Sequence, residues 1–185
     1  MASHRCPHWM GWFLLCPLRR LGQRPEKILA PFVSEGMTAL DVGPGMGYFS
    51  LPMARMVGPA GSVLCVDVEE KMLRSLEKRA ARAGLAGRIV TRTCAPESLG
   101  LDDFDGRVDF ALAFAMVHEV SDAGRLFADI FRALKPGGRC LFVEPKGHVR
   151  RAAFDASLAA AARAGFTLAP GPRVRTSHSA LLAKG

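Results

Sequence analysis

The sequence predicts an α/β fold built on a doubly wound, mostly parallel sheet. Short apolar stretches alternate with helix-like stretches along most of the chain, and a glycine-rich turn directly follows the first apolar stretch. Residues 108–117 are apolar almost throughout, as expected of a central strand that is buried on both faces. With 185 residues, of which 49% are hydrophobic and 23% charged, the chain is long enough for one domain with a full core.

Seven strands are expected from the apolar and alternating stretches. The last two are separated by a turn-rich loop with no helix, so they should pair antiparallel at one edge of the sheet. The expected strands are residues 37–40, 62–68, 88–94, 108–117, 139–145, 166–169 and 180–184.

Helices are expected between these strands. After the second strand, apolar residues recur three and four positions apart, and Gly84 marks the end of that helix. Ser121 is expected to cap a second helix that extends through Leu134 and ends at the sequence KPGG. A third helix is expected over residues 149–164.

The glycine-rich turn has an unusual neighbour, the carboxylate of Asp41. Glycines stand at Gly43, Gly45 and Gly47, whereas a dinucleotide-binding turn would have its third glycine at the position of Tyr48. A pyrophosphate would also be repelled by Asp41, which argues against a nicotinamide oxidoreductase. A ligand with a cationic amine and no phosphate fits better, because the glycines let it approach the backbone while Asp41 accepts from its ammonium.

Asp67 is the second fixed point of the predicted site. It ends the second strand, where an acid can accept two hydrogen bonds from a ribose diol. Adenosine joined to an amino acid without a phosphate describes S-adenosylmethionine. The glycine turn, Asp41 and Asp67 together therefore predict this cofactor.

Four motifs in order resemble the class I S-adenosylmethionine-dependent methyltransferases, in particular their UbiE-like small-molecule group. The motifs are LDVGPGMGYFS, VLCVDVEEKML, VDFALAFAMVHEV and LKPGGRCLFVEP, and the resemblance extends from about Pro25 to the C-terminus. It implies a Rossmann-like sheet with strand order 3-2-1-4-5-7-6 and an antiparallel seventh strand. It also implies a transferase that releases S-adenosylhomocysteine.

The same resemblance implies roles for individual residues. The aspartate that many relatives have at the end of the third strand is missing here, so backbone groups of Cys94 or Ala95, or the side chain of Glu97, are candidates for recognising adenine. Tyr48 and Phe114 are expected beside the cofactor, although packing alone would also explain them. The implied cofactor-binding residues are Asp41, Gly43, Gly45, Gly47, Tyr48, Asp67, Val68, Met72, Cys94, Ala95 and Phe114.

His118 is the candidate catalytic residue. It follows the fourth strand, at a position that faces the transferred methyl group in this fold, and a histidine can deprotonate or orient an acceptor. Alternatively, it only caps the strand end. Glu144, Lys146 and His148 lie on the same expected rim, where residues of this kind contact substrate or cap a helix. The sequence contains no residues with the spacing of metal ligands, and methyl transfer requires no metal ion.

The expected acceptor is a small molecule methylated on oxygen, nitrogen, sulfur or a soft element. The fourth-strand motif lacks the Asn/Asp-Pro-Pro-Tyr/Phe sequence of enzymes that methylate amide or base nitrogens, which argues against DNA and protein-glutamine substrates. Two alternatives remain open. The formal charge of +8 leaves an RNA methyltransferase possible, and the fold also permits a non-catalytic binding protein.

The predicted domains are an N-terminal flap at residues 1–24 and the methyltransferase domain at residues 25–185. The apolar stretch 9–18 is too short to span a bilayer, so we expect a flap over the domain, or a weak contact with a membrane surface. Cys6 and Cys16 raise the idea of arsenite capture, but the long cysteine-bearing segments of arsenite methyltransferases are missing. Five cysteines without a CxxC pair favour a cytoplasmic location.

Overall fold

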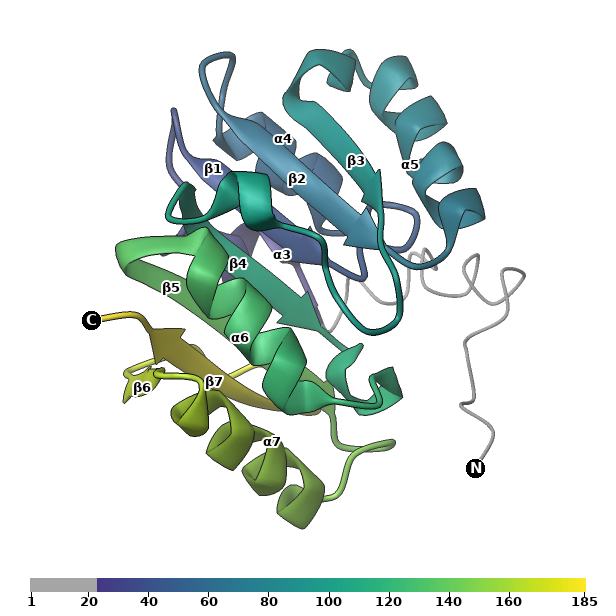
Figure 1. Cartoon of the computed structure of the whole chain (residues 1–185). Helices are drawn as coiled ribbons and strands as arrows, with labels where there is room; N and C mark the ends of the chain where they lie inside the picture. Colours follow the sequence, from purple (N-terminus) through teal and green to yellow (C-terminus); the bar gives the residue numbers. More distant parts are fainter. Residues whose placement is uncertain (1–22) are drawn as a thin grey trace. The chain divides into compact units, whose positions relative to one another are not determined.

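The computed structural model describes residues 23–185 and contains one seven-stranded sheet in the order β3-β2-β1-β4-β5-β7-β6 (Figure 1). The pairs β1–β2, β2–β3 and β4–β5 are parallel, whereas β7 runs antiparallel to β5 and β6. This confirms the predicted fold class, strand order and direction of the seventh strand. None of the helices within the described residues is both long and apolar enough to cross a membrane.

The elements follow one another in strand–helix alternation. The strands are β1 (Thr38–Val42), β2 (Ser62–Asp67), β3 (Ile89–Thr93), β4 (Val108–Phe114), β5 (Leu134–Pro145), β6 (Thr167–Ala169) and β7 (Ser177–Ala183). The α-helices are α3 (Pro25–Leu29), α4 (Ser50–Met56), α5 (Glu70–Arg82), α6 (Ala123–Ala133) and α7 (Arg151–Arg163), and the short 3-10 helices are η2 (Ala86–Arg88), η3 (Asp102–Phe104) and η4 (Val117–Glu119).

The chain divides into two compact units, the first ending at Cys94 and the second running from Ala95 to Gly185. In the first unit, β2 lies between β1 and β3, and its four central residues are buried. Helix α5 buries one face, with Met72, Leu73 and Leu76, while its charged residues lie on the other face. This packing holds α5 against β2 and β3, and β2 ends at Asp67, one of the predicted cofactor residues.

In the second unit, β5 is central, with β4 parallel on one side and β7 antiparallel on the other. Figure 1 shows α6 and α7 side by side against these strands. Aromatic rings fill the space between them: Phe142 of β5 contacts Phe127 of α6 and stacks on Phe154 of α7, at centroid distances of 5.4 and 4.7 Å. The aromatic packing anchors the carboxyl half of β5, which carries Glu144.

Several element boundaries differ from the predicted ones. Helix α6 is capped by Asp122, not Ser121, since the Asp122 carboxylate accepts from the backbone N–H of Arg125 at 2.9 Å. Leu134 begins β5 instead of ending α6, because it pairs with Val108 in the sheet. The KPGG sequence therefore lies inside β5, as an irregularity after which Arg139 pairs with Phe110.

Candidate functional site

The glycine turn after β1 is held in a conformation that only glycine adopts easily. The φ angles of Gly43, Gly45 and Gly47 are 66°, 54° and 85°. The N–H of Gly43 donates to the carbonyl of Val66 at 2.9 Å, which ties the start of the turn to β2. A Cβ on Gly47 would lie 3.1 Å from the side chain of Leu76, so the turn also packs tightly against α5. The turn thus presents backbone without side chains beside the end of β1.

Asp41 lies in β1 and is almost completely buried, with 2% of its surface exposed. The hydroxyl of Ser50 donates to its Oδ2 at 2.6 Å. Burial raises the pKa of Asp41 from 3.8 to about 7, an effect that the Ser50 bond opposes and the nearby charge of Asp67 reinforces. Within the described part of the chain, ionised Asp41 is therefore a buried charge whose side-chain hydrogen-bond partner is neutral, and a cation beside it would be strongly favoured.

Asp67 ends β2 and is partly buried. Its Oδ1 accepts from the backbone N–H of Glu69 at 2.9 Å. Burial raises the pKa of Asp67, while the backbone N–H groups of Glu69, Gly45 and Val68 oppose the shift. The backbone therefore holds this carboxylate at the end of β2, beside the glycine turn.

Of the remaining predicted cofactor residues of the first unit, Val68, Met72 and Cys94 lie near the end of β2, and Tyr48 follows the glycine turn. Val68 is 41% exposed although it is apolar, and Met72 is buried in α5. The backbone N–H of Cys94 donates to the carbonyl of Asp67 at 3.0 Å, which places the end of β3 beside Asp67. The hydroxyl of Tyr48 donates to the carbonyl of Gln23 at 2.6 Å, so the ring is fixed against the start of the described chain.

Arg79 was missed by the sequence analysis. Its guanidinium group donates to the carbonyl of Met46 within the glycine turn, which links α5 to the turn. Burial lowers its pKa. Helix α5 contains several basic residues, and nothing in the sequence singles out Arg79 among them.

Two further predicted residues, Ala95 and Phe114, belong to the second unit. Ala95 is exposed and forms an isolated bridge with Ser98. Phe114 is the last residue of β4 and is 8% exposed. Their assignment to cofactor binding remains a prediction.

His118 lies in η4 and is bonded twice to Glu144. Its backbone N–H donates to Glu144 Oε1 at 3.1 Å, and its ring Nδ1 lies 2.7 Å from Glu144 Oε2. The Glu144 side chain is 2% exposed and that of His118 is 27% exposed. The bond to Glu144 raises the pKa of His118, and burial partly opposes this effect. His118 was predicted from the sequence, but its pairing with Glu144, which was expected only on the rim, was not.

A strained turn brings His118 to Glu144. Ala115 directly follows β4 and has a φ of 58°, in the left-handed region that L-residues avoid. Its N–H donates to the carbonyl of Val143 at 2.8 Å, so the strand pairing continues up to the residue at which the chain turns back. Strain of this kind is often found where a side chain must be aimed for function.

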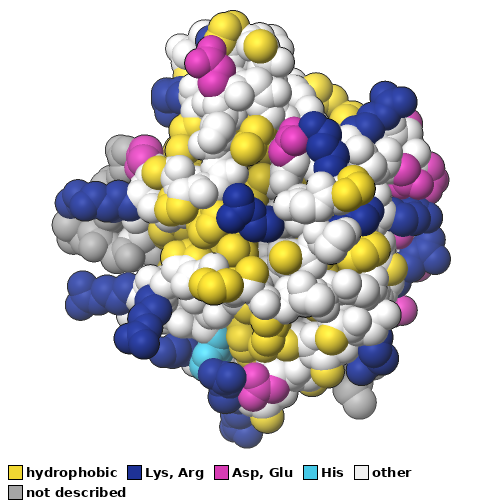
Figure 2. Space-filling view, turned by 90° about the vertical axis from the view of Figure 1, so that its left-hand side faces the viewer, with side chains coloured by type: hydrophobic (Ala, Val, Ile, Leu, Met, Phe, Trp, Pro, Cys, Tyr) yellow, Lys and Arg dark blue, Asp and Glu magenta, His cyan; other side chains and the backbone are white. Residues whose placement is uncertain are grey.

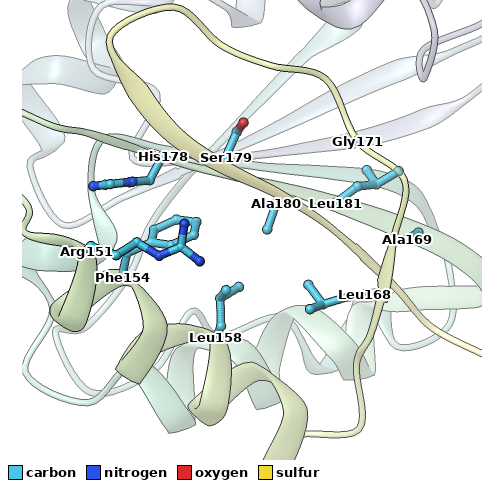
Figure 3. Close-up of a pocket in the computed structure, with 10 residues that line it drawn as sticks. All are labelled: Arg151, Phe154, Leu158, Leu168, Ala169, Gly171, His178, Ser179, Ala180 and Leu181. Carbon is cyan, nitrogen blue, oxygen red and sulfur yellow. The ribbon is translucent and has the colours of Figure 1, made fainter.

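A cavity of about 270 Å³ lies elsewhere in the second unit, between α7 and strands β6 and β7 (Figure 3). Figure 3 shows Arg151, Phe154 and His178 together at one end, with Leu158 and Leu168 toward the other. None of the predicted cofactor or catalytic residues lines this cavity. The cavity is therefore not part of the predicted cofactor or catalytic site.

Within the described residues, no cluster of three or more His, Cys, Asp or Glu side chains could hold a metal ion. Cys65 and Cys140 are buried in β2 and β5, as expected of small core residues. The predicted flap at residues 1–24, with Cys6 and Cys16, lies almost entirely outside the described residues. The proposed flap, the idea of arsenite capture and the domain boundary at residue 25 therefore stay predictions.

Comparison with known proteins matches residues 40–142 to the family described as "Methyltransferase domain". Curated relatives include the ubiquinone/menaquinone biosynthesis C-methyltransferases UbiE of Pasteurella multocida (31% identity over 60% of this chain and 41% of that protein) and Saccharophagus degradans (32% identity over 66% and 50%). The chain thus spans half or less of the length of these two relatives.

Solved structures share the fold. A SAM-dependent methyltransferase from Aquifex aeolicus has a TM-score of 0.85 at 24% identity, covering 97% of this chain and 99% of that one. The (4+2)-cyclase SpnF has a TM-score of 0.69 at 26% identity, covering 83% and 61%. The family match spans more than half of the sequence, including the glycine turn, Asp67 and His118, and S-adenosylmethionine is the cofactor that it implies. The chain belongs to the methyltransferase domain family.

Proposed function

We propose that this protein transfers a methyl group from S-adenosylmethionine to a small-molecule acceptor. The observation that carries this proposal is the pair of acids at the ends of β1 and β2, beside a turn of three left-handed glycines. Family membership supports the same function. The details of the cofactor contacts and of the acceptor belong to the proposal.

Asp41 provides a test of whether the cofactor fits. Its pKa of about 7 reflects a carboxylate that is unfavourable to ionise where it lies. A cationic ammonium group would remove that cost, whereas a pyrophosphate would increase it. The residues therefore fit a cationic amino acid group rather than a dinucleotide.

Asp67 and its neighbours fit the nucleoside part. The backbone fixes the Asp67 carboxylate, which would accept from the ribose hydroxyls. Val68, exposed directly after it, offers an apolar surface on which an adenine ring would lie, and Met72 would support that ring from α5.

The residues of the chain have different tasks in the reaction. The bound cofactor supplies an activated methyl group on a sulfonium sulfur. Asp41 and Asp67 would bind and orient it, and the glycine turn would allow close approach of the backbone. His118 would orient the acceptor and take its proton where the acceptor carries one.

The acceptor class is drawn from the relatives. The two UbiE proteins are named for ubiquinone and menaquinone biosynthesis, which makes quinol-like ring compounds the first acceptors to test. The neighbour SpnF is named as a cyclase, so the fold alone does not establish methyl transfer. We propose a cytoplasmic location because the five cysteines of the sequence form no CxxC pair, and Cys65 and Cys140 are buried core residues.

An RNA substrate is less well supported. Figure 2 shows Lys and Arg side chains scattered among apolar and neutral groups, mostly toward the edges of the face in view. The described residues visible there form no continuous basic patch of the kind that tracks a phosphate backbone. RNA binding with a steep salt dependence would revive this alternative.

The deciding experiment is calorimetric titration of the full chain with S-adenosylmethionine. Asp67→Ala should weaken binding at least about 10²-fold, because it removes charge-assisted hydrogen bonds. Asp155→Ala is the matched control, since Asp155 is exposed on α7 and pairs only on the surface with Arg151. Formation of S-adenosylhomocysteine is then measured with 1,4-naphthalenediol, simple phenols, thiols, amines and arsenite. Absence of wild-type binding would overturn the proposal.

A further inference from the structure

We infer that Glu144 is a positioning residue that holds the ring of His118 with its proton on Nδ1, leaving Nε2 as the atom that accepts a proton. This inference rests on the proposed function and deepens it. It assigns a task to a buried carboxylate that the sequence placed only on the expected rim and that lies outside the residues matched to the family. It also names the ring nitrogen that performs the chemistry.

The geometry of the two bonds carries the inference. Glu144 is fixed in β5, paired with His178 of β7 and 1% exposed. One of its oxygens accepts the backbone N–H of His118, at 3.1 Å, and the other lies 2.7 Å from Nδ1. The two contacts fix both the backbone and the ring of His118, so the ring has one orientation relative to β5.

The chemistry of the acceptor oxygens then decides the position of the proton. A carboxylate accepts hydrogen bonds and does not donate them, so a short contact with Nδ1 requires a proton on Nδ1. In the neutral ring the other nitrogen, Nε2, then has a free lone pair. The proton of an acceptor's hydroxyl or thiol group would pass to Nε2, forming an imidazolium ion that Glu144 stabilises. The imidazolium would afterwards return this proton to water.

Two further groups lie near the His118 ring. The Glu119 carboxylate lies 3.9 Å from Nε2, and the ring of His148 lies 6.1 Å from that of His118. Glu119 is partly exposed and contacts the nitrogen that would act as base, so it can pair with the imidazolium but does not fix the neutral ring. Glu144 and Glu119 therefore lie near opposite nitrogens of the ring, so a substitution of Glu119 is the control for the same substitution of Glu144.

The test is a long-range ¹H–¹⁵N correlation spectrum of the uniformly ¹⁵N-labelled full chain without cofactor. His118 is assigned by comparison with His118→Asn, among the five histidines of the sequence. At a pH well above the pKa of the ring, the wild type should show a protonated Nδ1 and an unprotonated Nε2. The opposite pattern in the wild type would overturn the inference without any variant.

Glu144→Gln sharpens the test because glutamine has one oxygen and one amide nitrogen. Its oxygen can accept the backbone N–H of His118 only if its NH₂ group faces Nδ1, which must then be unprotonated. In the variant the proton of the neutral ring should therefore be on Nε2 and Nδ1 should be unprotonated. The pKa of the ring should also be lower than in the wild type. Glu119→Gln should leave the proton on Nδ1.

The outcomes separate this inference from the proposed function. If both glutamine variants keep the wild-type pattern, Glu144 does not determine the tautomer and the inference is wrong. If Glu144→Gln does not fold, the wild-type spectrum still decides. Titration of the same samples with S-adenosylmethionine reports on the proposed function independently, since the spectra require neither cofactor nor activity.

Discussion

Each unit contains a nearly fully buried carboxylate beside its predicted site residues, Asp41 in the first unit and Glu144 in the second, and the two are satisfied in different ways. Asp41 in the first unit accepts from a neutral hydroxyl, that of Ser50, and its pKa is raised to about 7. Glu144 in the second unit accepts two bonds from a single residue, His118, which can itself become a cation. Among the described residues, Asp41 has no cationic side-chain partner, whereas Glu144 has a partner that can become a cation.

The two buried acids are therefore suited to different tasks. A buried carboxylate without a cation gains most from a ligand that brings one, so Asp41 is suited to bind an ammonium group. A buried carboxylate already bonded to a histidine gains little from a ligand, but it controls the proton of that histidine. The first unit is therefore suited to ligand binding and the second to proton transfer.

The largest expected effect concerns the second acid and its histidine. His118→Asn keeps an amide N–H that can reach Glu144 but removes the base, so methyl transfer should slow about 10²- to 10⁴-fold. In the wild type, the rate should rise as pH increases through the pKa of His118, which lies above 6.5, because only the neutral ring accepts a proton. The rate of S-adenosylhomocysteine formation, measured as a function of pH in the wild type and in the variant, checks both expectations. An unchanged rate in the variant would show that His118 only caps the strand end.

The next effect concerns the first acid and protein stability. The pKa of Asp41 is higher in the folded state, so its contribution to stability is fully present below pH 3.8 and is lost as pH rises through about 7. Asp41→Asn avoids this loss and should raise the free energy of unfolding by up to about 4 kcal/mol above pH 7, with little effect in acid. Urea unfolding of the wild type and the variant, above pH 7 and below pH 3.8, measures this difference in the free energy of unfolding.

Asp129→Asn is the matched control for that prediction. Asp129 is also 2% exposed, but it accepts from the N–H of Leu99 at 3.0 Å and pairs with Arg125 and Arg132. Removing its charge should destabilise the protein, since it leaves these partners without a carboxylate. If both variants changed stability in the same direction, the contrast between unpaired and paired buried acids would be wrong.

A smaller effect tests the glycine turn beside Asp41. Gly47→Ala should lower the free energy of unfolding by about 2–4 kcal/mol, from a left-handed φ and a contact with the buried Leu76. Gly84→Ala has a similar φ of 69° but no atom within 4 Å of the added Cβ, so it should cost only about 1–2 kcal/mol. Equal losses in denaturant unfolding would show that the turn is not tightly packed against α5.

The sequence predicted the fold well because local patterns determine it. Apolar stretches and turns located all seven strands, and the glycine turn and Asp67 could be identified from their positions at strand ends. The start of β5 was predicted wrongly because KPGG has the residues of a turn, although pairing with β4 keeps it within the strand. Tertiary pairing here overrides local preference.

The parts of the site that escaped prediction depend on contacts between distant residues. The pairing of His118 with Glu144 spans 26 positions and requires the left-handed turn at Ala115, which no residue type signals. The bond from Ser50 to Asp41 and that from Arg79 to Met46 likewise depend on how helices pack beside the turn. Residue types alone identified candidates, but not their partners.

The most direct test of the account is the affinity for S-adenosylmethionine as a function of pH, in the wild type and in Asp41→Asn. Because Asp41 must be ionised to bind an ammonium group, wild-type affinity should fall about tenfold per pH unit below its pKa of about 7. The ligand's α-amino group, with an ordinary pKa of about 8, stays protonated in that range. Asp41→Asn should bind more weakly near pH 7 and lose this dependence. A pH-independent wild-type affinity, or a variant that binds as tightly as the wild type, would contradict the account.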